Sequence, residues 1–175
     1  MANIETSRLR LLALNASQLK LYAQSPVLLA VELGLALVDL AVEPEFWAEM
    51  PDAIRKVCLP GVQAHPGRYE WYTHWVMILP SDNRLVGGIG LSGWPDEQGR
   101  VFMGYYVDDH FAGRGLATEA VEAMTEWAMH QEEVKSVMAD TLKEGIASQR
   151  VLEKNGFELL EETDEGHLRW QKRNE

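Results

Sequence analysis

The sequence predicts a mixed α+β domain in which a mostly antiparallel central sheet is flanked by helices. Segments rich in aromatic and β-branched residues alternate with segments whose apolar residues recur at helical spacing. Short turns join the strand-type segments in the middle of the chain. The stretch Val101–His130 then runs from a strand, through a turn with two glycines, into a helix. Strands and helices in this order are typical of α+β proteins.

The N-terminal part is predicted to contain one strand and two helices. Residues Thr6–Leu14 alternate loosely between apolar and polar side chains, which favours a strand. Asn15 is a suitable N-cap for a helix over Ala16–Ala23. Pro26 can begin the next helix, because a first helical turn tolerates proline. The apolar residues that keep helical spacing after it are Val27, Leu28, Val31, Leu35 and Val38.

A third helical segment is expected over Glu45–Val57. Pro51 is expected to split it, since proline lacks the N–H that a helix interior needs. Leu59-Pro60-Gly61 and His65-Pro66-Gly67 are typical turn sequences. The helical section is therefore predicted to end with them.

The middle of the chain is predicted to form an antiparallel meander. Tyr69–Leu79, Leu85–Ser92 and the segment beginning at Val101 are rich in aromatic and branched residues, which favour strands. Pro80–Asn83 and Gly93–Gly99 are turn and loop sequences between them.

The C-terminal part is predicted to alternate helices and strands. The helix that begins near Leu116 has one apolar face, and Lys135–Thr141 follows it as a strand. Ile146–Asn155 is the next helix, and Gly156 supplies the left-handed residue that ends it. The last segment, Phe157–Gln171, is expected to be a hairpin.

Composition limits the class of protein. With 175 residues, the chain is interpreted as a single domain over residues 1–175. Cys58 is the only cysteine, so no internal disulfide can form, which fits a reducing cytoplasm. The net charge of −11 argues against a nucleic-acid partner and suits cationic partners. The N-terminus shows no secretory signal, and the apolar stretch Leu28–Leu40 is too short to span a bilayer, so no membrane partner is expected.

The turn Ala112–Ala117 is the main candidate for a binding site. The first turn of a helix has free N–H groups and a positive dipole end, and glycines allow an anion to approach the backbone. The turn is therefore predicted to hold a pyrophosphate; the alternative is a simple tight connection. Two other phosphate motifs are excluded, because no lysine follows Gly115 and position 118 of a GxGxxG pattern is Thr118.

The residues from Ala112 to Ala120 resemble the acetyl-CoA loop of the GCN5-related N-acetyltransferases (GNAT), which reads Q/R-x-x-G-x-G/A. Gly115 and Ala117 match, whereas Ala112 stands where glutamine or arginine is usual. The form G-R-G-L-A-T-E-A is similar to the branch that acetylates the N-termini of ribosomal proteins. The order of predicted elements also agrees with the family from Ile4 onward. The resemblance implies the acyl-CoA N-acyltransferase fold and acetyl-CoA as co-substrate.

The resemblance also implies which residues contact acetyl-CoA. The loop and the helix start would hold the pyrophosphate, and the end of the preceding strand would hold the pantetheine arm. The expected cofactor-binding residues are Tyr105, Tyr106, Val107, Ala112, Gly113, Arg114, Gly115, Leu116, Ala117, Thr118 and Gly145.

A second family signature, N-x-x-S before a helix that ends in K-x-G-F or a near variant, resembles the segment from Gly145 to Phe157. Ser148, Gly156 and Phe157 match, but Gly145 replaces the asparagine. In the family that side chain caps the helix and contacts the cofactor or the neighbouring backbone. The replacement affects one cofactor contact rather than the fold, because glycine is itself a tolerable N-cap.

Acetyl transfer requires a neutral amine, a donor for the developing oxyanion and a proton for the leaving thiolate. The resemblance implies that a backbone N–H near Val107 meets the thioester carbonyl. It also implies Ser148 as general acid, since related enzymes use this serine, while the tyrosine of other members is replaced by Leu152. Asp140 lies where some relatives carry a catalytic glutamate, and is the candidate base. The alternative for Ser148 is a structural role, in which its hydroxyl accepts hydrogen bonds from backbone N–H groups of the first helical turn. The alternative for Asp140 is a carboxylate at the end of a strand that has no role in the reaction.

The expected partner is an amine acceptor, with a basic peptide or protein N-terminus favoured. Five carboxylates lie within Glu158–Glu165, either as a solvated face or as a rim that attracts cations. The histidines have no metal-ligand spacing, so no metal is predicted. A small-molecule N-acetyltransferase and a non-catalytic acyl-CoA-binding module are the alternative functions. Both a monomer and a homodimer are compatible with the sequence.

Overall fold

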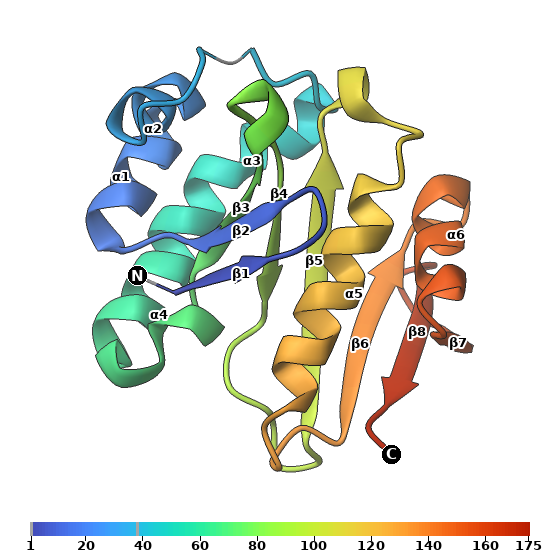
Figure 1. The fold of residues 1–175 in the computed structure, drawn as a ribbon. Helices are drawn as coiled ribbons and strands as arrows, with labels where there is room; N and C mark the ends of the chain where they lie inside the picture. Colours follow the sequence, from blue (N-terminus) through green and yellow to red (C-terminus); the bar gives the residue numbers. More distant parts are fainter. Residues whose placement is uncertain (1, 38) are drawn as a thin grey trace.

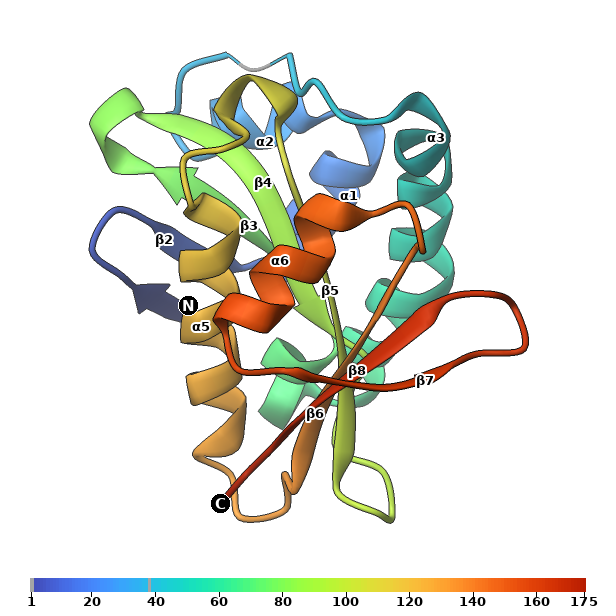
Figure 2. The ribbon, with the colours of Figure 1, turned by 90° about the vertical axis from the view of Figure 1, so that its right-hand side faces the viewer.

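The computed structural model describes residues 2–37 and 39–175, which form an eight-stranded sheet with helices on both faces (Figures 1 and 2). The strands are β1 (Asn3–Glu5), β2 (Arg10–Ala13), β3 (His74–Leu79), β4 (Arg84–Leu91), β5 (Arg100–Val107), β6 (Ser136–Thr141), β7 (Glu158–Glu162) and β8 (Leu168–Arg173). The helices are α1 (Ala16–Gln24), α2 (Pro26–Glu32), α3 (Pro44–Ala53), α4 (Leu59–Ala64), α5 (Leu116–Met129) and α6 (Ile146–Lys154). The predicted α+β class is confirmed.

The sheet has the order β1-β2-β3-β4-β5-β6-β8-β7. All neighbouring pairs are antiparallel except β5 and β6, which are parallel. Two parallel neighbours need a crossover, and α5 supplies it. The predicted meander, central helix and final hairpin are all present.

The N-terminal prediction needs two corrections. Residues 6–14 are not one strand, because Thr6 and Ser7 turn the chain between β1 and β2. The helix after Pro26 ends at Glu32, and Gly34 then takes a left-handed φ of 67°. Leu35 therefore lies beyond the helix, and Val38 lies outside the described residues. The Asn15 cap is confirmed as a capping box with Gln18.

The expected break at Pro51 is wrong. Pro51 lies inside α3, and the chain continues through a π-helix (Ile54–Cys58) directly into α4. Ile54 is fully buried in this segment, so packing outweighs the missing N–H. Gly61, expected in a turn, lies in α4, where a Cβ would stand 2.9 Å from Tyr72 Cβ. That glycine is explained by close packing.

The strand predicted from Tyr69 begins only at His74. Residues Pro66–Trp71 form a 3₁₀ helix instead. Trp71 is buried against Trp94 and Trp127, and Trp75 also contacts Trp127. The aromatic residues in this segment therefore report burial rather than strand structure.

The sheet separates two cores, with α5 and α6 on one face and α1, α3 and α4 on the other (Figure 2). The core beneath α5 and α6 includes Met77, Val121, Met124, Leu152 and Trp170. The opposite core includes Leu19, Tyr22, Leu29, Ile54 and Val76. Among the described helices, none combines the length and apolarity needed to cross a membrane.

A buried histidine lies on the α3 side of the sheet. The ring of His74 is stacked against the ring of Tyr22 and against that of Tyr106, and its Nε2 lies 3.1 Å from the Tyr106 hydroxyl. The Tyr106 hydroxyl is also hydrogen-bonded to that of Tyr22. A Cβ at Gly88 would stand 2.3 Å from His74 Nε2, so this glycine makes room for the ring. Burial lowers the pKa of His74 from 6.5 to about 4.

We predict that His74 makes stability depend on pH between about 6.5 and 4. The depressed folded-state pKa means that the unfolded chain binds a proton in this window while the folded protein does not. The His74 contribution is complete above pH 6.5 and is lost as the pH falls to 4, with a slope of at most about 1.4 kcal/mol per pH unit. Denaturant unfolding at several pH values measures it.

His74→Phe, which keeps an aromatic ring in the stack, should flatten that slope. The matched control is His65→Phe, because His65 is exposed yet also stacked, on Tyr72. Equal pH slopes for wild type and His74→Phe would contradict the prediction.

Candidate active site

The strands β5 and β6 separate partway along their length. They pair only from Arg100↔Ser136 to Phe102↔Met138, although β5 continues to Val107 and β6 to Thr141. Figure 1 shows the two strands diverging toward their C-terminal ends. The central sheet therefore contains an opening, which we call the β5–β6 opening, between residues 103–107 and residues 139–141.

Backbone groups of β5 point into this opening. Phe102 N–H donates to Ser92 Oγ (3.0 Å) and Asp108 N–H donates to Val86 O (2.8 Å), so both face β4. Successive strand residues direct their N–H and C=O groups to alternate sides. Residues 103, 105 and 107 therefore direct theirs toward β6, where the pairing has ended. This edge can bind a further extended chain.

The turn before α5 presents a cluster of backbone donors at the same end of the sheet. Gly113 and Gly115 adopt left-handed φ values of 75° and 76°, and Gly115 is the N-cap of α5 without a side-chain cap. In the described part of the chain, the N–H groups of residues 113–118 donate to no protein acceptor. A Cβ at Gly113 would meet nothing within 4 Å. Free donors, open space and the positive helix end fit a pyrophosphate.

Arg8, in the turn between β1 and β2, braces this loop. Its Nη1 donates to Arg114 O (2.7 Å) and its Nε donates to Glu119 Oε2 (2.7 Å). Glu119 also accepts from Thr6 Oγ1 (2.5 Å). Partial burial acts to raise the pKa of Glu119, but the hydrogen bonds from Thr6 and Arg8 lower it overall. Sequence reasoning missed this brace, because its members are more than 100 residues apart.

The start of α6 borders the opening on the other side. Gly145 is its N-cap and provides no side-chain hydrogen bond, as the sequence implies. Gln149 takes part of that role, since its Nε2 donates to Leu142 O (3.0 Å) and Lys143 O (2.9 Å). The Tyr105 hydroxyl donates to Ser148 O (3.1 Å) and so joins β5 to α6. Burial raises the pKa of Tyr105 to about 12.

The Ser148 side chain is half-buried in the first turn of α6. Tyr105, whose hydroxyl donates to the Ser148 carbonyl, also has a side-chain hydrogen bond with Ser148, which acts to lower the pKa of Tyr105 against the effect of burial. Among the described residues, no hydrogen bond joins the Ser148 hydroxyl to an N–H group of the first turn of α6.

Asp140, the candidate base, forms an ion pair. Arg169 on β8 donates from Nε to Asp140 Oδ1 and from Nη2 to Oδ2, both at 2.9 Å. Hydrogen bonding to Asp140 raises the pKa of Arg169, which also lies 3.5 Å from Glu161 and over the Phe102 ring. Two of the five hairpin carboxylates are thus paired with cations, since Glu162 also pairs with Lys143 (2.5 Å).

The predicted site residues thus fall around one opening. The loop 112–118, the strand end 105–107, Gly145, Ser148 and Asp140 all border it. One side chain is turned away, since Tyr106 points into the aromatic network beneath α3 and offers only its backbone. Within the described residues, no group of three or more histidines, cysteines or carboxylates could hold a metal ion.

Comparison with known proteins agrees with this geometry. Residues 41–158 match the model of the acetyltransferase (GNAT) domain. The chain is similar to an uncharacterised N-acetyltransferase, YjdG, of Bacillus subtilis (strain 168), with 26% identity over 91% of each chain.

Two solved structures share the fold. RimL, a ribosomal L7/L12 α-N-protein acetyltransferase in complex with coenzyme A, superposes with a TM-score of 0.69 at 14% identity over 98% of each chain. The ribosomal-protein-S5-alanine acetyltransferase of Vibrio fischeri gives 0.68 at 16% identity, over 100% of this chain and 98% of the other. Since the family model covers well over half of the residues, the chain belongs to the GNAT family of acetyl-CoA-dependent N-acetyltransferases.

Proposed function

We propose that this enzyme acetylates a polypeptide α-amine, with acetyl-CoA held along the β5–β6 opening. The observation that carries the proposal is the set of unpaired β5 backbone groups next to the free N–H groups of residues 113–118. Acetyl-CoA supplies an activated acetyl thioester when it is bound. We also propose that residues 1–175 act as one domain. A cytoplasmic location of the protein remains a prediction.

Two groups of residues fit two different parts of acetyl-CoA, the pyrophosphate and the pantetheine arm. The backbone donors of residues 113–118 would hold the pyrophosphate, with Arg8 keeping Arg114 in place through its carbonyl. The edge groups of Met103 and Tyr105 would bind the amides of the pantetheine arm as a strand edge binds another strand. Val107 N–H would donate to the thioester oxygen, where negative charge develops during the reaction.

Two proton transfers complete the chemistry. The amine nitrogen forms a bond to the acetyl carbon as the carbon–sulfur bond breaks, so the amine loses a proton and the thiolate gains one. The Ser148 hydroxyl, which lies beside the Tyr105 hydroxyl, is the proposed donor to sulfur. Asp140 is the candidate acceptor of the amine proton, through water, since a carboxylate has about four lone-pair sites and Arg169 occupies two.

The acceptor is proposed to be a cationic polypeptide N-terminus. The net charge of −11 and the acceptors named for the two fold relatives support it. Family membership favours an enzyme over the non-catalytic module. The test is CoA release with intact-mass detection, for a panel of basic peptides, a polyamine and an aminoglycoside. Turnover of the small amines alone would contradict a polypeptide acceptor.

Gly115→Val should weaken acetyl-CoA binding at least tenfold, about 1.4 kcal/mol, because the added side chain covers the backbone donors. Calorimetry of the folded variant measures it. Gly166→Val is the matched control, since Gly166 has a similar φ of 80° but lies in the β7–β8 turn. Equal losses in both variants would assign the effect to backbone strain instead.

Ser148→Ala should lower kcat about 10²-fold and leave acetyl-CoA affinity and thermal stability nearly unchanged. The proton matters only as the thiolate develops, and in the variant the Tyr105 hydroxyl keeps its hydrogen bond to the carbonyl of residue 148. Stopped-time assays with saturating acceptor measure kcat. Tyr105→Phe is the companion variant: a loss in that variant alone would assign the acid role to the tyrosine hydroxyl.

For a basic peptide, kcat/KM should fall as salt rises, and should fall again when Glu161 and Glu162 both become glutamine. Removing these carboxylates weakens the field that attracts a cation, which salt screens over about 10 Å at 0.1 M. The KM for acetyl-CoA should not rise.

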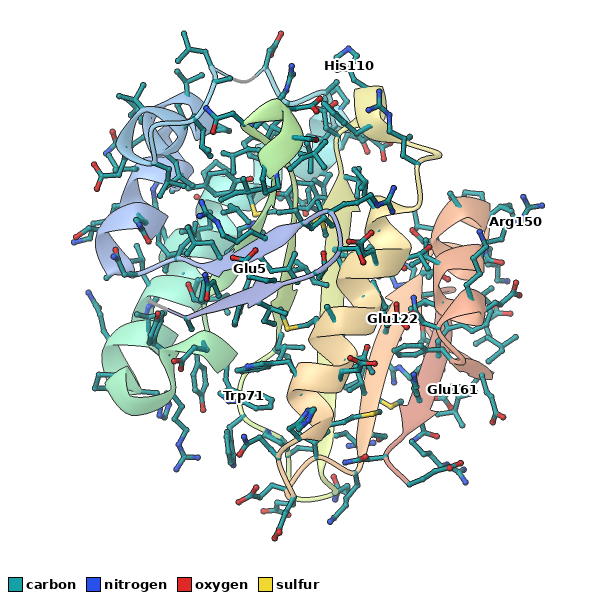
Figure 3. The ribbon with its side chains drawn as sticks, in the orientation of Figure 1. Glu5, Trp71, His110, Glu122, Arg150 and Glu161 are labelled. Carbon is teal, nitrogen blue, oxygen red and sulfur yellow. The ribbon has the colours of Figure 1, made fainter. Side chains whose placement is uncertain are left out.

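Glu122→Gln with Glu126→Gln makes the same charge change on the exposed face of α5. Figure 3 marks Glu122 on this helix and Glu161 on β7. This control pair should keep the wild-type salt slope. An equal effect of both pairs would show that only net charge matters.

A further inference from the structure

Gly104 is an exposed glycine in the middle of the central strand β5. Its φ is not left-handed, and a Cβ built on it would meet nothing within 4 Å. Two other sheet glycines are explained by packing, since a Cβ at Gly87 or Gly88 would stand 2.3 Å from Tyr106 O or His74 Nε2. Glycine in the interior of a strand lowers the stability of that strand. Neither a left-handed backbone nor a close packing contact explains why position 104 is glycine.

The position of Gly104 suggests the reason. Met103 and Tyr105 face the core beneath α5 and α6, so by alternation Gly104 faces the α3 side. It lies two residues beyond Phe102, the last residue of β5 that pairs with β6. Asp140 lies two residues beyond the partner of Phe102, Met138, and is held there by Arg169. Gly104 and Asp140 therefore flank the same end of the opening.

We propose that Gly104 is a specificity-determining residue for the acceptor, leaving room for a primary amine whose carbon carries a substituent. This inference rests on the proposed function. The open space above Gly104 receives the amine-bearing carbon and its side chain, on the strand face that Gly104 shares with Phe102 and Asp140. The chemical class is the first residue of a polypeptide with a side chain, in preference to an unbranched amine.

The experiment compares Gly104→Ala and Gly104→Val with wild type on peptides that differ only in their first residue. Peptides beginning with alanine or serine should lose at least about tenfold in kcat/KM, whereas the peptide beginning with glycine should lose less. Acetyl-CoA affinity by calorimetry should be unchanged. The melting temperature should stay equal or rise, because the new Cβ enters open space. Gly67→Ala, at another exposed glycine with open space, is the control and should change neither measurement.

The outcomes separate this inference from the proposed function. Wild-type turnover of peptides with unchanged first-residue preference in both Gly104 variants overturns the inference alone. A loss of acetyl-CoA affinity instead would place the co-substrate above Gly104 and also overturns it. A wild-type protein that binds acetyl-CoA but acetylates no peptide overturns both.

Discussion

The site depends on one constraint: β5 and β6 stop pairing after Phe102 and Met138. Unpaired backbone groups inside a sheet are costly unless something else binds them. The two strands are held by different partners beyond that point. Tyr105 joins β5 to the start of α6, while Arg169 on β8 holds Asp140 on β6. The strand ends on both sides of the opening are thus each held by a side-chain contact.

The same end of the sheet carries the anion-binding loop, because a parallel crossover returns α5 with its N-terminus above the end of β5. Loop conformation alone would leave the donors mobile. The Arg8–Glu119 ion pair and the Arg8–Arg114 contact anchor the loop to the first hairpin of the chain. The turn between the N-terminal strands therefore helps to fix the conformation of this loop, although it is more than 100 residues away in sequence.

The two faces of the sheet have separate roles. The α5–α6 face brings the loop, Tyr105 and Ser148 together over one core. The α3 face carries His74 and Tyr106 in a buried stack, whose lowered His74 pKa keeps the ring neutral near pH 7. Gly104 and Asp140 lie on that second face. Under the proposed function, the co-substrate and the acceptor would approach the β5–β6 opening from opposite faces of the sheet.

Local sequence was sufficient where the cause is local: the Asn15 N-cap, the two-glycine turn between β5 and α5, and the left-handed Gly156 that ends α6. It failed where burial outweighs propensity, as at Pro51, Gly61 and the residues before His74. The Asp140–Arg169 pair, the Arg8 brace and the end of the β5–β6 pairing join segments far apart in the chain. Only the tertiary structure decided these features, because no local pattern encodes which distant strand or helix a side chain will meet.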